Sequence, residues 1–148
     1  VKQSLLNFAF YNRRPITKSM LAWWAFTNEQ QAYLSLEQPF EIEHIYARNR
    51  QDVDGGLNDK RNIERLGNKS LLEKSVNIRV SDFRFEDKVK KYKGYMNDKG
   101  KHIDGTKIQD LLTIDTRYTN FNETDIESRN NLIIDEFIDY LSTENLFR

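Results

Sequence analysis

The sequence predicts an α+β domain that is mostly helical. Apolar residues recur at the three- and four-residue spacing of amphipathic helices near the start, in the middle and near the end of the chain. Segment 40–46 instead alternates apolar and polar residues, as a half-buried strand does. Hydrophobic residues make up 38% of the 148 residues and aromatic residues 12%, which is enough for one core. We therefore expect one domain over 1–148.

The first helix is expected over about 17–35. Thr17 follows Pro15 and is a suitable N-cap, and Met20 and Trp24 then lie four residues apart. After Pro39 comes the alternating strand. The chain between 62 and 72 indicates extended or mixed structure, and a short helix is expected to begin between Ser70 and Val80.

The next helix is expected over about 84–96. Its apolar residues lie at positions i, i+4, i+7 and i+11, namely Phe85, Val89, Tyr92 and Met96. A polar loop containing His102 follows. The last helix, about 125–143, carries the clearest apolar stripe, which is rich in isoleucine.

The composition excludes several classes of chemistry. The chain has no cysteine, which rules out disulfides, thiolate zinc sites and a cysteine nucleophile. Its two histidines are His44 and His102, so a metal site must use mostly oxygen ligands, which suits Mg²⁺ or Mn²⁺. No apolar run approaches the roughly 20 residues of a membrane span, and no signal peptide opens the chain. We expect a cytoplasmic fragment of a larger protein that makes no membrane contact.

The net charge of zero hides an asymmetry. Residues 58–93 carry eleven basic and six acidic side chains, whereas residues 94–148 carry six basic and eleven acidic ones. A basic middle segment beside an acidic tail is expected where one face meets a polyanion, although a solvated charged helix gives the same pattern. The candidate nucleic-acid-binding residues are Lys69, Lys74, Arg79 and Lys88.

One ordered set of residues suggests a reaction. Glu43 precedes His44, Asn68 follows Gly67, and Asn77 comes nine residues after Asn68. Hydrolysis of a phosphodiester needs a base for water and a cation that neutralises charge on the phosphoryl oxygens. A histidine beside a carboxylate supplies the base and an oxygen ligand, and an amide oxygen can supply another ligand without repelling phosphate.

These motifs resemble the HNH, or ββα-metal (His-Me finger), nuclease family. The form is that of the C-terminal domain of GmrSD-type modification-dependent restriction and phage-defence proteins. The matching segments are Glu43-His44-Ile45-Tyr46-Ala47, Leu66-Gly67-Asn68-Lys69-Ser70-Leu71-Leu72, Asn77, Phe85-Glu86-Asp87-Lys88 and Ile126-Glu127-Ser128-Arg129. The resemblance covers roughly residues 17–141.

The resemblance implies a ββα-metal unit at about 40–81 among flanking helices, and an endonuclease of a restriction or defence protein. His44 would be the general base, and Glu43 and Asn77 would bind one Mg²⁺ or Mn²⁺ ion. Asn68 would tie the loop between the strands and fix His44. The implied substrate is DNA, with RNA also open. The parent protein would carry an N-terminal nucleotide-dependent domain or partner subunit. This chain has no Gly-rich phosphate loop and should bind no nucleotide itself.

Two positions depart from the family pattern. Ala47 stands where proline is usual, which removes a restraint on φ after the histidine. Lys69 replaces the usual leucine and would place a charge near the phosphate. The alternatives are an inactive HNH-like module that binds nucleic acid or contacts a subunit, and a plain helical interaction domain. A glycosidase pair of Glu41 and Glu43 has no further support in the sequence.

Overall fold

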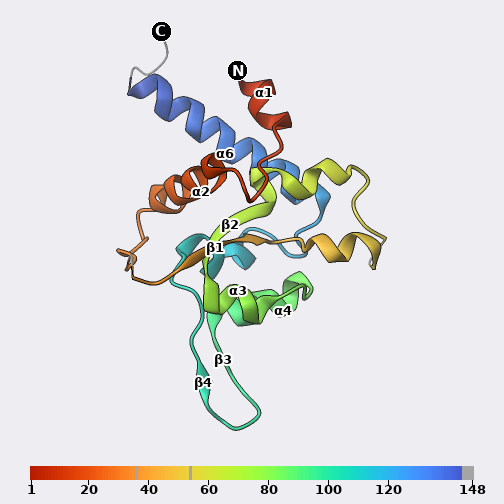
Figure 1. Cartoon of the computed structure of the whole chain (residues 1–148), viewed down its shortest axis with the longest axis vertical. Coiled ribbons are helices and arrows are strands. Elements are labelled where there is room, and N and C mark those ends of the chain that lie inside the picture. Colours follow the sequence, from red (N-terminus) through yellow and green to blue (C-terminus); the bar gives the residue numbers. More distant parts are fainter. Residues whose placement is uncertain (36, 54, 145–148) are drawn as a thin grey trace.

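The centre of the molecule is an antiparallel pair of short strands, β1 (Phe40–His44) and β2 (Lys69–Glu73). The computed structural model describes residues 1–35, 37–53 and 55–144 (Figure 1). The register sets Phe40 opposite Glu73 and His44 opposite Lys69. A second pair, β3 (Tyr95–Met96) and β4 (His102–Ile103), forms a hairpin that projects from the body (Figure 1).

Helices make up most of the remaining regular structure in the described ranges. The α-helices are α1 (Lys2–Asn7), α2 (Pro15–Thr27), α3 (Lys74–Val80), α4 (Phe85–Lys93), α5 (Gln109–Leu112) and α6 (Glu123–Thr143). The 3₁₀-helices are η1 (Arg48–Asp52), η2 (Lys60–Glu64), η3 (Leu66–Asn68) and η4 (Ile114–Thr116). The expected fold class, α+β and mostly helical, is therefore confirmed. No helix in these ranges is long and apolar enough to cross a membrane.

The segment expected to form a strand–strand–helix unit at 40–81 has that order. Strand β1 leads through η1, η2 and η3 into β2, and α3 begins directly after β2 at Lys74. In Figure 1 the strand pair lies between α2 and α6 on one side and α3 and α4 on the other. This arrangement places the end of β1 beside the C-terminal half of α3.

The core lies where α6 packs on η3 and where α2 packs on β2. The side chains that contribute to it are almost fully buried, among them Leu21, Leu66, Leu72, Val80 and Ile133. Gly67 lies so close to α6 that an added Cβ would meet the Ile126 carbonyl at 2.2 Å. Only glycine permits this approach, so Gly67 brings η3 against α6.

Arg129 of α6 fixes the same contact. Its guanidinium is buried and donates to the carbonyls of Gly67 (2.9 Å) and Lys69 (2.8 Å). It also pairs with Asp110 at 2.6 Å. The motif Ile126-Glu127-Ser128-Arg129 thus supplies the side chain that holds the Gly-Asn turn.

Several predicted helix bounds were wrong. The first helix begins at Pro15 rather than Thr17, because proline fits the first helical position. Thr17 instead donates to the Tyr11 carbonyl at 2.8 Å. This helix ends at Thr27, not near residue 35, because Asn28 adopts an extended backbone (ψ 118°).

The middle helix also differs from its expected range of 84–96. It ends at Lys93, because Gly94 has φ +92°. Met96 therefore leaves the helical stripe and lies exposed in the hairpin. The last helix begins at Glu123, two residues before the expected start, since Asn122 and Asp125 form a capping box.

Candidate active site

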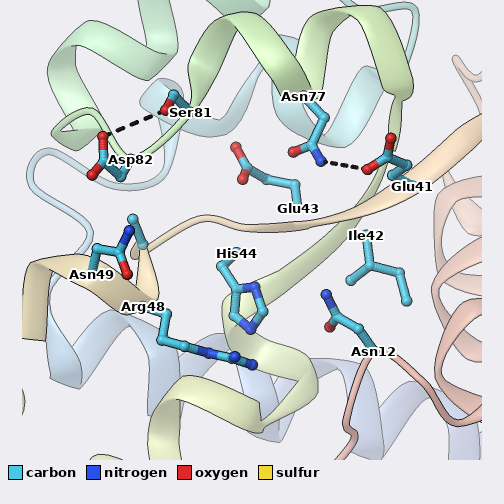
Figure 2. A pocket seen from close by; sticks show the side chains of 11 residues that line it. Asn12, Glu41, Ile42, Glu43, His44, Arg48, Asn49, Asn77, Ser81 and Asp82 are labelled. Atoms are coloured by element: carbon cyan, nitrogen blue, oxygen red, sulfur yellow. Dashed lines mark hydrogen bonds between the residues drawn. The ribbon is translucent and has the colours of Figure 1, made fainter.

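An open, mostly polar pocket of about 410 Å³ surrounds the end of β1. Strand β1 contributes Glu43 and His44 to its lining, and Asn77 and Asp82 come from α3 and the turn after it. Asn12, in the segment before α2, completes one wall. Figure 2 shows these side chains around the strand end. The pocket therefore combines segments that lie far apart in the sequence.

Glu43 and His44 leave β1 on opposite sides, as neighbours in a strand must (Figure 2). The strand ends at His44. Because the pocket wraps this free end, both side chains border it although they do not face each other. We expected the strand to end or bend here, and it ends.

His44 lies against a carboxylate that the sequence analysis did not single out. Its Nε2 is 3.3 Å from Glu64 Oε1, and only 14% of the histidine side chain is exposed. Burial lowers the pKa of His44 below its ordinary value, and the hydrogen bond with Glu64 opposes this shift only in part. The neutral ring is the form that can accept a proton, so burial favours the form a base requires.

Besides His44, two cationic side chains contact Glu64. Lys69 Nζ lies 2.6 Å from Oε2, and Arg48 Nη2 lies 2.6 Å from Oε1. Burial alone would raise the pKa of Glu64, but its hydrogen bonds with His44 and Lys69 and the charge of Lys69 lower it well below the usual range. Glu64 therefore stays a carboxylate at neutral pH.

Glu43 is buried on the other side of the strand, with 3% of its surface exposed. Lys88 donates to its Oε1 (3.1 Å), and the Tyr92 hydroxyl donates to its Oε2 (2.7 Å). Burial raises the pKa of Glu43, and the charge of Lys88 opposes the shift. Lys88 also donates to the His44 carbonyl at 2.6 Å, so α4 binds the strand end directly.

Asn68 lies buried beneath the turn that follows His44. Its Oδ1 accepts from the Tyr46 backbone N–H at 2.7 Å, and its Nδ2 donates to the carbonyls of Tyr46 (3.0 Å) and Ile63 (3.1 Å). The structure thus places Asn68 between the two halves of the unit. Its part in catalysis stays a prediction.

Asn77 and Asp82 face the pocket from α3 and the turn after it (Figure 2). Asn77 Nδ2 donates to Glu41 Oε2 at 3.3 Å, which directs one side of the amide toward β1. No group of three or more histidine, cysteine or acidic residues in the described part of the chain is arranged to hold a metal ion. Any cation here would depend on amide and single carboxylate oxygens from different elements.

The structure corrects the expectation that Lys69 and Lys88 contact nucleic acid. Both side chains are fully buried, Lys69 against Glu64 and Lys88 against Glu43. A buried lysine needs an anionic or polar partner, and each of these lysines has one inside the protein. The replacement of the usual leucine by Lys69 had suggested a charge near the phosphate. The buried position of Lys69 shows that it places no charge at the surface.

The two other candidate basic residues lie on α3. Lys74 is exposed at the first position of the helix, and Arg79 donates a hydrogen bond to the Asp104 carbonyl at 3.0 Å. Their contact with nucleic acid stays a prediction. His102 is exposed in the hairpin beside Asp104, at 3.2 Å.

The backbone at Ala47 has a conformation that proline would also accept. Ala47 has φ −65° and ψ 135°, and −65° is the value that a proline ring fixes. Asn68 holds the turn after His44 through hydrogen bonds with the backbone N–H and carbonyl of Tyr46.

Fold and site together define a small α+β domain with a histidine and oxygen donors around the free end of a two-stranded sheet. A comparison with protein-family models matches residues 1–136 to the family described as GmrSD restriction endonucleases, C-terminal domain. The chain belongs to this family. Membership indicates a nuclease domain of a restriction protein, with DNA as its substrate and a further N-terminal domain as its partner. Comparisons with curated proteins and with solved structures found no match.

Proposed function

We propose that this domain hydrolyses phosphodiester bonds of DNA with a divalent cation and with His44 as the general base. The observation that carries the proposal is the position of His44. In a chain of a restriction endonuclease family, a neutral histidine borders an open pocket lined by carboxylate and amide oxygens. This combination provides the base and the cation ligands that phosphodiester hydrolysis needs.

The donors around the pocket suit one hard cation. Glu43, Asn77 and Asp82 offer oxygen atoms from three elements, and Mg²⁺ is commonly held by one or two carboxylates together with substrate phosphate oxygens. Glu43 Oε1 accepts from Lys88 and Oε2 accepts from the Tyr92 hydroxyl, whereas an ionised carboxylate offers about four lone-pair sites in all. Asp82 lines the same pocket as Asn77. A bound cation would supply charge neutralisation at the phosphoryl and leaving oxygens.

The residues of the chain divide the remaining work. His44 takes the proton from the attacking water, and burial keeps its imidazole neutral for that step. Asn68 holds the backbone on both sides of Tyr46 and so fixes the direction in which His44 leaves the strand. Lys88 binds the His44 carbonyl and limits movement of the same backbone from the other side.

One observation favours a second function, that of an inactive module that binds nucleic acid or a subunit. Both Glu43 oxygens are engaged by Lys88 and Tyr92, and the ammonium group of Lys88 repels a cation placed beside it. If that repulsion prevents metal binding, the domain recognises DNA without cutting it.

Supercoiled plasmid separates the two functions. We expect wild-type protein to nick it in the presence of Mg²⁺ or Mn²⁺ and not in the presence of EDTA. His44→Ala should lose about 10²- to 10⁴-fold in rate, the contribution of a general base, while keeping its melting temperature and Mn²⁺ affinity. Nicking by His44→Ala at the wild-type rate excludes this residue as the base. Binding of DNA with no nicking by either protein supports the inactive module.

A further inference from the structure

The contacts of His44 continue into a chain of buried charges that ends at the N-terminal segment. We propose that Glu64 is a positioning residue that fixes the imidazole of His44, and that Lys69, together with Phe10 and Asn12, holds Glu64 in place. This inference rests on the proposed role of His44 as the base. It adds a residue that neither the sequence motifs nor the family description assigns.

The contact between Glu64 and His44 determines which ring nitrogen carries the proton. Glu64 Oε1 lies 3.3 Å from His44 Nε2. An ionised carboxylate can only accept a hydrogen bond, so the neutral ring must donate its proton from Nε2. The lone pair then lies on Nδ1, and a base needs its lone pair on a defined nitrogen. The same carboxylate stabilises the imidazolium that forms once the ring has taken a proton.

Glu64 is itself held in place by the segment before α2. The fully buried ammonium group of Lys69 has three N–H donors and three acceptors: Glu64 Oε2 at 2.6 Å, Asn12 Oδ1 at 2.8 Å and the Phe10 carbonyl. The backbone N–H of Phe10 also donates to the Glu64 carbonyl at 2.8 Å. Both the main chain and the side chain of Glu64 are thus tied to the segment before α2.

A purely structural ion pair would show the same contacts, so the test must observe His44 itself. The chain has two histidines, which makes a ¹H–¹⁵N spectrum of ring N–H groups simple to assign with His44→Ala as reference. In wild-type protein at neutral pH we expect a slowly exchanging, downfield Nε2–H signal from His44. Glu64→Ala should lose this signal, and Glu64→Gln, which keeps an acceptor oxygen, should retain it at reduced downfield shift.

Asp59→Asn is the matched control. It removes one carboxylate beside the same 3₁₀-helix, where Asp59 pairs with Arg61 at 2.9 Å, and asparagine can still cap that helix. The His44 signal should be unchanged in this variant. An identical His44 signal in wild-type, Glu64→Ala and Glu64→Gln protein would overturn the proposal.

Kinetics supply a second readout. We expect Glu64→Ala to lower kcat for plasmid nicking about 10- to 100-fold with little change in KM, because a misplaced base slows chemistry more than binding. Glu64→Gln should recover part of the loss. If Glu64→Ala does not fold, the Glu64→Gln spectrum and rate decide alone, and wild-type values for both refute the inference. If the His44 signal changes in the Glu64 variants but His44→Ala nicks plasmid at the wild-type rate, Glu64 positions His44 and the proposed function is refuted.

Discussion

Two ion pairs lie on the two sides of β1, a buried pair of Lys88 with Glu43 and a pair in which the buried Lys69 meets the partly buried Glu64. In each pair the ammonium group also donates to a backbone carbonyl, so it fixes the chain as well as the carboxylate. Buried pairs contribute little net stability, but removal of one partner costs about 3–5 kcal/mol. These lysines are therefore best understood as residues that hold the site in one conformation.

Asn68 and Asn77 should respond differently to replacement by alanine. Asn68→Ala removes the hydrogen bonds that its side chain makes with the Tyr46 N–H and with the carbonyls of Tyr46 and Ile63, and the loss of hydrogen bonds to buried polar groups costs about 1–3 kcal/mol. Asn77→Ala removes one hydrogen bond at the pocket rim and should leave the melting temperature close to wild type. Thermal melts combined with Mn²⁺ titration by calorimetry measure both effects.

In the metal titration we expect Asn77→Ala to be affected more than Asn68→Ala, the reverse of their order in thermal stability. Asn77→Ala should need much more Mn²⁺ for activity, and Asn68→Ala should be rescued poorly by added metal. Wild-type Mn²⁺ affinity in Asn77→Ala would indicate that Asp82, and not Asn77, binds the metal ion. Glu73 does not line this pocket, and its two oxygens accept from Thr106 and from the Lys107 backbone N–H.

At this scale the sequence predicted which residues gather at the site but not what they touch. Glu43, His44 and Asn77 of the ordered motif line one pocket and Asn68 lies beneath the turn after His44, and their roles stay predictions. Glu64 could not be found, since it lies 20 residues from His44 and reaches it only through the pairing of β1 with β2. The burial of Lys69 and Lys88 also depends on tertiary packing, so composition alone counted them as surface charge.

Among the elements, α3 and α6 position the site. Helix α6 holds η3 through Gly67 and Arg129, and α3 brings Asn77 to the pocket. Helices with a strong apolar stripe, such as α6, were predicted almost to the residue. The short elements α1 and α5, the 3₁₀-helices and the β3–β4 hairpin were not, because so few residues carry no recognisable period and packing against other segments stabilises them.

Helix α3 offers a test of the nucleic-acid face. Lys74 is exposed and lies three residues before Asn77, so both side chains project from one face of the helix. Lys74→Glu should weaken DNA binding and reduce the slope of log K against log salt by about 0.9 for each phosphate that the protein no longer neutralises. The measurement is DNA affinity by fluorescence anisotropy at several salt concentrations.

Lys2→Glu is the control for that change in charge, because Lys2 lies on α1 against α6 (Figure 1) and pairs with Asp135. Its slope should equal that of wild type. Equal slopes for Lys74→Glu and Lys2→Glu would mean that α3 does not meet the DNA.

Across the whole molecule, one buried carboxylate joins helices that are distant in sequence. Asp110 of α5 accepts from Trp24 of α2 at 3.1 Å and pairs with Arg129 of α6 at 2.6 Å and with Arg117 at 2.7 Å. Burial alone would raise the pKa of Asp110, but the charge and hydrogen bond of Arg129 lower it overall. The general fold class followed from the sequence, whereas this connection did not, because nothing in the pattern pairs residues 24, 110 and 129.

The lowered pKa makes the stability of the domain depend on pH. A carboxyl group whose pKa is lower in the folded state stabilises the fold above its unfolded pKa of about 3.9, and the contribution is lost as the pH falls through the folded pKa. Asp110→Asn should destabilise the protein by about 3–5 kcal/mol at pH 7, since Arg129 stays buried without its anion.

Because acid protonates Asp110 in wild-type protein, the difference between the two proteins should shrink as the pH falls from about 5 towards 3. Urea unfolding at about pH 7, 5 and 3.5 measures this difference. Asp139→Asn, on the exposed face of α6, should match wild type at each pH. A gap between wild type and Asp110→Asn that stays constant over this range would show that Asp110 is not the group responsible.

Chemical rescue can show whether His44 is the base of a metal-dependent nuclease. In His44→Gly protein the side chain is replaced by a space that opens to the pocket and can admit free imidazole. With supercoiled plasmid and Mn²⁺ present, we expect nicking to be nearly absent, to return as imidazole is added, and to saturate at high imidazole. Nicking that is already at the wild-type rate without imidazole, or that imidazole leaves unchanged, would contradict the assignment.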